Sequence, residues 1–277
     1  MSIVIVVKVS EGVVLGADSA ATLSGQLKDP AGSVYNGVLK TFYNARKLLQ
    51  VGDFPIGVLS WGGAFIGNRT LESHVREWEH NEHWLRRESF PDKHSTASFQ
   101  AKHCADGLHA HLSRVYAEEY ACISAEQRPQ IGIIVAGYSD GAFFPEIWRF
   151  VLPHDTEVHN QRPDKDGKPD FGASWFGVTE PIVRLHFGRD ELVGRILSER
   201  FKIPEAEIWE ALKPLQYPVA FPQMPLQDAI DYAVYVLNVA VGRFRFVLGP
   251  ELCGGQLDIA VITQNEFTWI CQKSWRA

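Results

Sequence analysis

The chain opens with two apolar runs separated by a short polar turn. The first run, Ile3–Val9, is rich in β-branched residues and is interrupted only by Lys8. Ser10-Glu11-Gly12 supplies the turn, and residues 13–18 form the second run. β-Branched residues favour strands, and two such runs around a short polar turn are typical of a hairpin. We therefore predict that the chain enters a buried β-hairpin almost at its first residue.

Further strands are predicted wherever short apolar runs lie between turn residues. A second hairpin pairs residues 47–51 with 56–61, and a final hairpin pairs 257–263 with 267–271. Residues 131–137 are almost continuously apolar, which predicts a strand buried on both faces. The remaining predicted strands are residues 145–152 and 173–178.

Helices are predicted where the apolar positions recur with the spacing of a helical face. One runs from Ala64 to about Arg87, with an interruption near residues 79–82, and a second follows Pro91 with Ser95 or Thr96 as its cap. The buried stripe of this second helix comprises Ala101, Cys104, Leu108, Leu112 and Val115.

The second half of the chain contains two further predicted helices. Residues 181–201 form one, with Leu192, Val193, Ile196 and Leu197 on its buried side. Residues 226–241 give the clearest helical pattern, and Pro225 suits a first turn. The predicted stripe of this last helix is Leu226, Ala229, Ile230, Ala233, Val234, Leu237, Ala240 and Val241.

Three polar or proline-rich stretches separate these elements. Residues 19–44 are predicted to be a loop with a short strand or hairpin near 38–43, and residues 153–171 an exposed loop or solvated hairpin. Residues 203–225 form a proline-rich connection with no independent core on either side. We therefore predict one domain over residues 1–277, with alternating α/β composition.

Composition excludes several classes of protein. The 277 residues are 45% hydrophobic and 22% charged with a net charge of −6, and no basic run suggests a nucleic-acid partner. No apolar run reaches the ~18–20 residues of a membrane span, and the start lacks the basic region of a signal peptide. The dispersed cysteines Cys104, Cys122, Cys253 and Cys271 indicate reduced core residues. These features predict a soluble cytoplasmic protein.

The second residue carries candidate chemistry. Removal of Met1 is expected because Ser2 is small. A terminal serine has a hydroxyl and an α-amine on one residue, and the amine titrates near pH ~7.7–8.0. Such a residue can be both a nucleophile and its own general base.

Four segments resemble the β-type subunits of the 20S proteasome family, within the N-terminal nucleophile hydrolases. They are SIV…GVVLGADS at residues 2–19, ARKLL at 45–49, SWGGA at 60–64 and GGQLDIAVIT at 254–263. Together they extend over nearly the whole chain. The resemblance implies an α/β fold of the four-layer α-β-β-α sandwich type. It also implies a peptidase or amidase without metal or organic cofactor, and assembly as a homo-oligomer.

The resemblance assigns a role to each candidate catalytic residue. Ser2 is the nucleophile, Lys47 supplies the positive charge, and Asp18 holds that lysine. Gly62 donates its N–H to the oxyanion. The residues implied to line the substrate pocket are Ala21, Ala45, Leu49, Ser60 and Ala64, a small and mostly apolar set that favours an uncharged side chain.

Several positions depart from the family pattern. The nucleophile is serine where the family has threonine, and the long segment between Asp18 and Lys47 makes Lys40 a competitor for the catalytic lysine. Pro250 and Cys253 stand where the family has an aspartate and a serine, with Glu251 adjacent. An accessory serine after the 173–178 strand is also missing, and Thr179 is the nearest hydroxyl. These changes leave weak activity, a different substrate or no catalysis as alternatives.

Two other functions stay open, and a metal site is not predicted. A proteasome-like chain can be a non-catalytic scaffold or gate, and other N-terminal nucleophile enzymes are amidases of small metabolites. His80 and His83 lack the i, i+4 spacing of the zinc helix motif. His103, His109 and His111 are predicted to lie on different faces of one helix. We therefore expect no bound metal.

Overall fold

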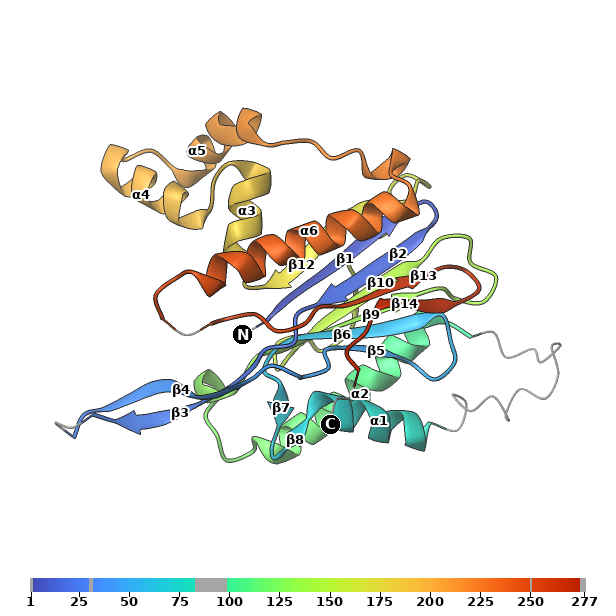
Figure 1. Cartoon of the computed structure of the whole chain (residues 1–277), viewed down its shortest axis with the longest axis horizontal. Coiled ribbons are helices and arrows are strands. Elements are labelled where there is room, and N and C mark those ends of the chain that lie inside the picture. The colour runs from blue at the N-terminus through green and yellow to red at the C-terminus, as the bar shows by residue number, and fades with distance from the viewer. Residues whose placement is uncertain (1, 30–31, 83–98, 250, 275–277) are drawn as a thin grey trace.

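Two antiparallel sheets form the centre of the computed structural model, which describes residues 2–29, 32–82, 99–249 and 251–274 (Figure 1). The first sheet has the strand order β12-β1-β2-β13-β14. Its strands are β1 (Ile3–Val9), β2 (Gly12–Ala17), β12 (Gly172–Gly177), β13 (Asp258–Ile262) and β14 (Phe267–Cys271). The predicted first and last hairpins are confirmed, and they lie side by side through pairing of β2 with β13.

The second sheet has the order β11-β10-β9-β6-β5. Its strands are β5 (Leu48–Gln50), β6 (Ile56–Gly62), β9 (Ile131–Gly137), β10 (Glu146–Leu152) and β11 (His159–Asn160). Every residue of β9 is buried, as its continuous apolar run predicts. The predicted exposed stretch 153–171 contains only the short β11 and an isolated bridge.

Helices cover the outer face of each sheet (Figure 1). The helix α6 (Leu226–Arg245) packs on β1 and β2, whereas α1 (Leu71–Asn81) and α2 (Ala101–Glu119) share a core cluster with the second sheet. A third cluster, which includes Val4, Leu15 and Ile134, fills the space between the two sheets. Burial of apolar side chains in these three clusters provides the main favourable contribution to the free energy of folding.

The helix predicted over 226–241 is confirmed and continues to Arg245. Its fully buried positions recur every three or four residues, which places them on one face. They are Ala229, Ile230, Ala233, Val236, Leu237 and Ala240. The close approach to the sheet explains Gly16 of β2, because a Cβ there would lie 2.8 Å from a methyl of Leu237.

The prediction of a mostly irregular 19–44 segment was wrong, although the strand expected near 38–43 falls within a longer observed strand. The strands β3 (Ala21–Lys28) and β4 (Val34–Phe42) form a hairpin that extends from the body of the molecule (Figure 1). The sequence obscured it because its strands carry several apolar residues on exposed faces. Leu23, Val34, Tyr35, Leu39 and Phe42 are all exposed.

The prediction of a single helix over residues 181–201 was also wrong. Gly188, with φ of 64°, ends α3 (Glu180–Phe187), and Asp190 caps a separate α4 (Glu191–Phe201). Leu192 and Ile196, predicted to be buried, are half exposed at 49% and 51%. A helix in the proline-rich connection, α5 (Glu205–Leu212), was not predicted. Among the described residues, the short 3-10 turns are Ala125–Gln127, Lys213–Leu215 and Phe221–Gln223.

The helix predicted from Ala64 begins seven residues later. The short strands β7 (Phe65–Ile66) and β8 (Arg69–Thr70) come first, and the Thr70 side chain then accepts a hydrogen bond from the Ser73 N–H to cap α1. The predicted end near Arg87, the caps Ser95 and Thr96, and His83 lie outside the described residues. In the described part of the following helix, the N-cap is Gln100.

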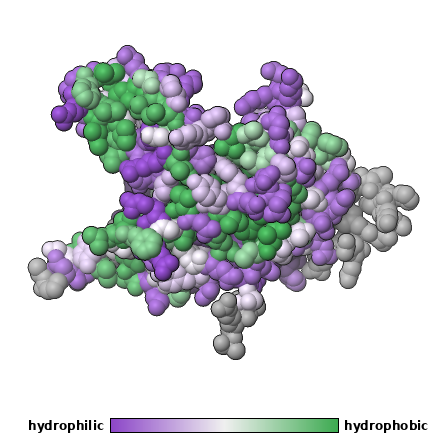
Figure 2. Space-filling view, turned by 45° about the horizontal axis from the view of Figure 1, so that its top comes forward, coloured by the Kyte–Doolittle hydropathy of each residue, from purple (hydrophilic) through white to green (hydrophobic). Residues whose placement is uncertain are grey.

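Exposed apolar side chains gather on two projections of the molecule. Figure 2 shows green surface on the β3–β4 hairpin and on the lobe formed by α4 and α5, to which Leu192, Ile196 and Phe201 contribute. Cys104 and Cys253 are buried, but Cys122 and Cys271 are exposed, which corrects the prediction that all four are core residues. Within the described ranges, no helix is both long and apolar enough to cross a membrane.

Candidate active site

Asp18 is the buried centre of the candidate site. It follows β2, and its side chain has no exposed surface. One carboxylate oxygen accepts the Ile3 N–H at 3.0 Å, and the other accepts the N–H groups of Ala20 at 3.2 Å and Gly254 at 2.9 Å. Three backbone donors fix the carboxylate, because a buried charge requires such compensation.

Lys47 completes this network from the residue before β5. Its Nζ lies 2.5 Å from Asp18 Oδ1, and only 4% of its side chain is exposed. Burial lowers the pKa of Lys47 below its ordinary value of 10.5, and the Asp18 charge partly opposes this change. The predicted pairing of Asp18 with Lys47 is therefore present in the structure.

The backbone of Ser2 is held on both sides. Its carbonyl oxygen accepts the Val178 N–H at 2.8 Å, and the next N–H, of Ile3, donates to Asp18. Gly177 adopts φ of 97°, and a Cβ there would collide with the Ser2 carbonyl group. Glycine is thus required where β12 approaches the start of β1.

Ser2 and Lys47 line a common cavity of about 240 Å³. Of the five predicted pocket residues, Ala45, Ser60 and Ala64 belong to its lining. Ala21 and Leu49 do not; Leu49 is buried in the core between the second sheet and its helices. Leu48, its neighbour in β5, points to the opposite face and packs between the two sheets.

Gly62 lies at the end of β6, with φ of 85°. The Ser60 N–H donates to the Lys47 carbonyl on the β5 side, and the Gly63 N–H donates to Gln130 on the opposite side. Because peptide groups alternate along a strand, the Gly62 N–H points toward the β5 side, where Ala45 lines the cavity. Gly62 itself is not among the lining residues.

Cys253 lies beside the ion pair and is 1% exposed. Burial raises its thiol pKa to about 12, the Asp18 charge adds to this effect, and Lys47 opposes it. Its sulfur therefore stays a protonated thiol near neutral pH and is a poor nucleophile, since the thiolate is the reactive form. The adjacent Gly254 contributes through its backbone, by donating to Asp18.

The alternative lysine, Lys40, is exposed on β4 and pairs with Leu23 across the hairpin. It does not line the cavity. The geometry thus pairs Lys47, not Lys40, with Asp18 and places it in the wall of the cavity that Ser2 also lines.

The cavity wall includes charged residues that the sequence analysis missed. Arg46 and Glu72 form an ion pair of 3.7 Å and both line the cavity. Arg46 is adjacent to Lys47, but Glu72 comes from α1, so their meeting depends on tertiary structure. A second buried pair, Lys273 with Asp258 at 3.1 Å, supports the wall because Lys273 Nζ also donates to the Ala45 carbonyl.

Comparison with known proteins gives information on the fold. No family profile and no curated protein matches the sequence. Among solved structures, the (Gly-1) mutant of Anbu from Hyphomicrobium sp. strain MC1 matches with a TM-score of 0.54 and 14% identity, over 99% of this chain and 86% of that one. The match supports a proteasome-like fold. At this identity the similarity concerns the fold alone, and the catalytic assignment rests on the geometry above.

Proposed function

We propose that this protein is an N-terminal nucleophile hydrolase of the proteasome β type, which cleaves peptide or amide bonds with Ser2 once Met1 has been removed. The observation that carries the proposal is that Ser2 and Lys47 line one cavity while buried Asp18 holds the lysine. Nucleophile, cation and orienting carboxylate are the groups that such catalysis requires.

The packing supports the finer fold assignment, a four-layer α-β-β-α sandwich. The helix α6 lies over the first sheet, an apolar cluster joins the two sheets, and α1 and α2 lie over the second. The proteasome-like resemblance further favours a homo-oligomer in the cytoplasm. The exposed apolar side chains of the β3–β4 hairpin and of α4 offer surface for such contacts.

In the proposed reaction, the Ser2 Oγ attacks the substrate carbonyl carbon while the free Ser2 α-amine accepts the hydroxyl proton. The Gly62 N–H donates to the oxyanion, and the Lys47 ammonium stabilises the negative charge near Ser2. When the tetrahedral intermediate collapses, the substrate C–N bond breaks and the protonated α-amine gives its proton to the leaving amine. Water then hydrolyses the resulting ester, which restores the Ser2 hydroxyl.

The rate should depend on pH through two groups. We expect kcat/KM to rise as the Ser2 α-amine loses its proton, near or below its usual pKa of ~7.7–8.0. As the pH rises further, kcat/KM should fall again, with a midpoint below pH 10.5, because burial lowers the pKa of Lys47 from that value. Once deprotonated, Lys47 no longer stabilises the negative charge near Ser2. Steady-state rates from pH 5 to 11 test this bell-shaped profile.

The matched variant is Lys47→Arg, whose guanidinium stays charged throughout this range. If it retains activity, its alkaline limb should disappear. An alkaline limb identical to that of the wild type would contradict the assignment of that limb to Lys47.

Intact-protein mass spectrometry with a β-lactone or epoxyketone probe tests the proposed nucleophile directly. The expected result is loss of Met1 and a single adduct that peptide mapping assigns to Ser2. Retention of Met1 with no adduct would favour a non-catalytic scaffold. Labelling with activity on small amides and none on peptides would instead favour a small-molecule amidase.

A further inference from the structure

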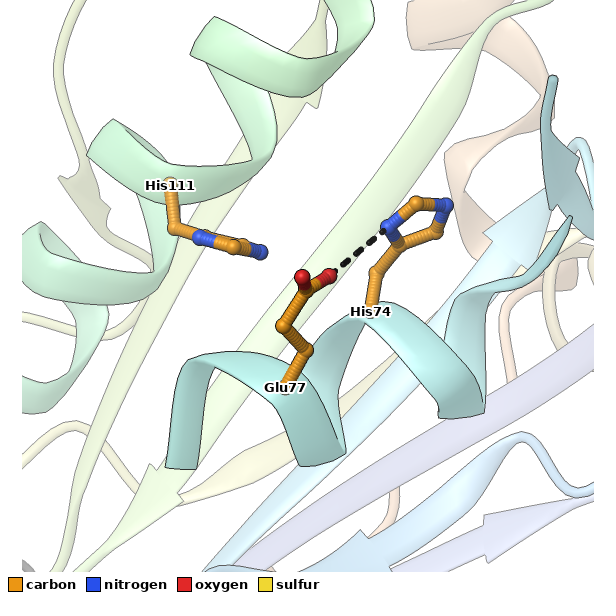
Figure 3. Close-up of side chains that lie close together, drawn as sticks. All are labelled: His74, Glu77 and His111. Atoms are coloured by element: carbon orange, nitrogen blue, oxygen red, sulfur yellow. Dashed lines mark ion pairs between the residues drawn. The ribbon is translucent and has the colours of Figure 1, made fainter. Parts of the chain in front are cut away.

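A cluster of potential metal ligands lies between α1 and α2, outside the candidate cavity. His74 and Glu77 come from α1, and His111 comes from α2. Figure 3 shows the Glu77 carboxylate between the two imidazole rings. One ligand atom from each residue lies within 4.8 Å of the other two.

The hydrogen bonding of His74 determines which ring nitrogen is free. His74 is 2% exposed, and its Nε2 lies 3.2 Å from the carbonyl oxygen of Ile66. A carbonyl oxygen only accepts, so Nε2 carries the proton and Nδ1 of the neutral ring presents a lone pair. Nδ1 has no hydrogen-bond partner and faces Glu77 Oε2 at 3.9 Å. A buried lone pair that faces a carboxylate is unfavourable unless a cation, either a proton or a metal ion, lies between them.

His111 presents a second unpartnered nitrogen on the opposite side of Glu77. Its Nε2 is buried and has no hydrogen-bond partner. Burial, followed by the positive charge of Arg114, lowers the pKa of His111 below its ordinary value. A buried imidazole nitrogen without a hydrogen-bond partner is a suitable ligand for a metal ion.

We propose that His74, Glu77 and His111 bind a divalent transition-metal ion of the zinc type. Two imidazole nitrogens and one carboxylate oxygen suit Zn²⁺, whereas Mg²⁺ and Ca²⁺ prefer oxygen ligands alone. Tetrahedral coordination at Zn–N distances of ~2.0–2.1 Å places ligand atoms about 3.4 Å apart. His74 Nδ1 and Glu77 Oε2 lie 3.9 Å apart and all three ligand atoms lie within 4.8 Å of one another, so side-chain shifts that shorten these separations by up to about 1.4 Å reach that geometry.

The surrounding contacts orient these ligands. Metal-bound histidines usually donate their second ring N–H to a carbonyl or carboxylate, as His74 does to Ile66. Arg69 donates to the same Glu77 Oε2 at 2.6 Å, which orients the carboxylate, and a carboxylate oxygen keeps a further lone pair for a metal ion. Arg69 is 46% exposed, so solvent screens its repulsion of a bound cation.

A metal ion here would act on the structure of the candidate site. It would join α1 to α2, and α1 begins at Leu71. Thr70, Leu71 and Glu72 line the cavity that contains Ser2. The bound ion would therefore fix one wall of that cavity from a distance, without contacting substrate. The inference does not depend on the proposed hydrolase activity.

The test uses the full-length protein after treatment with a chelator. Isothermal titration calorimetry with Zn²⁺ should give one ion per chain, Co²⁺ should give visible absorption bands, and Mg²⁺ should not bind. Zn²⁺ should also raise the melting temperature, because it binds only the folded state. We expect His111→Ala and Glu77→Gln each to weaken Zn²⁺ binding by at least about 100-fold.

The matched control is His103→Ala, which removes an exposed histidine from the same helix. It should bind Zn²⁺ as the wild type does. His111 and Glu77 are only partly buried, so circular dichroism should show that their metal-free variants stay folded. Absence of one-to-one Zn²⁺ binding, wild-type affinity in both ligand variants, or an equal loss in His103→Ala would overturn the proposal.

Discussion

Ser2→Ala is expected to reduce the proposed hydrolysis of amide substrates by up to roughly 10⁶-fold, the order of loss found when the nucleophilic serine is removed from a serine protease. The variant keeps the α-amine and the backbone contacts with Val178 and Asp18 and loses only the hydroxyl. Its melting temperature should therefore change little. Steady-state kinetics with fluorogenic peptides and small amides, beside a thermal melt, provide the measurement.

Ser2→Thr is the informative companion variant. It restores the nucleophile of the resembled family and keeps a hydroxyl on the same carbon. Activity in Ser2→Thr together with its loss in Ser2→Ala would assign the reaction to the side-chain oxygen. Full activity in Ser2→Ala would refute the proposed mechanism, because no other oxygen of this residue can serve as the nucleophile.

Asp18→Ala is expected to destabilise the protein by about 3–5 kcal/mol, the cost of leaving a buried charge without its partner. The substitution removes the carboxylate from Lys47 and also from three backbone N–H groups. Lys47→Met should cost less, because those three donors still satisfy Asp18. It should nevertheless abolish catalysis. Urea denaturation of each variant gives the two free energies.

The double variant tests whether the two residues act as a pair. Asp18→Ala with Lys47→Met leaves no unpaired charge, so its destabilisation should be smaller than the sum of the single effects. Lys40→Ala is the control for a lysine outside the site, with an expected change within about ±0.5 kcal/mol. Additivity of the two single effects would contradict the proposed coupling.

Local patterns in the sequence predicted much of the fold. The β-branched run at residues 3–9, the apolar run at 131–137 and the stripe of residues 226–241 each occur in the expected element. In these segments periodicity and burial agree, so short-range information suffices. Two of the mispredicted segments, the β3–β4 hairpin and α4, carry exposed apolar residues such as Leu23 and Leu192.

The candidate catalytic residues could be predicted from the sequence, because they occur in the same order as in the family that the chain resembles. Asp18 ends one predicted strand and Lys47 starts another, and the structure pairs them. Only part of the cavity wall could be predicted from the sequence. Leu49 lies in the core between the second sheet and its helices, and Glu72 enters the wall from a helix whose start the sequence placed too early.

The sequence by itself determined the strands of the core, the helix α6 and the residues that could carry chemistry, because these follow from local periodicity and residue type. Only the tertiary structure decided which side chains meet. His74 and His111 are far apart in the chain, and each has an ordinary helical context. They become a candidate metal site because α1 and α2 pack together and bury two nitrogens without hydrogen-bond partners. Such proximity depends on long-range packing, which no local pattern encodes.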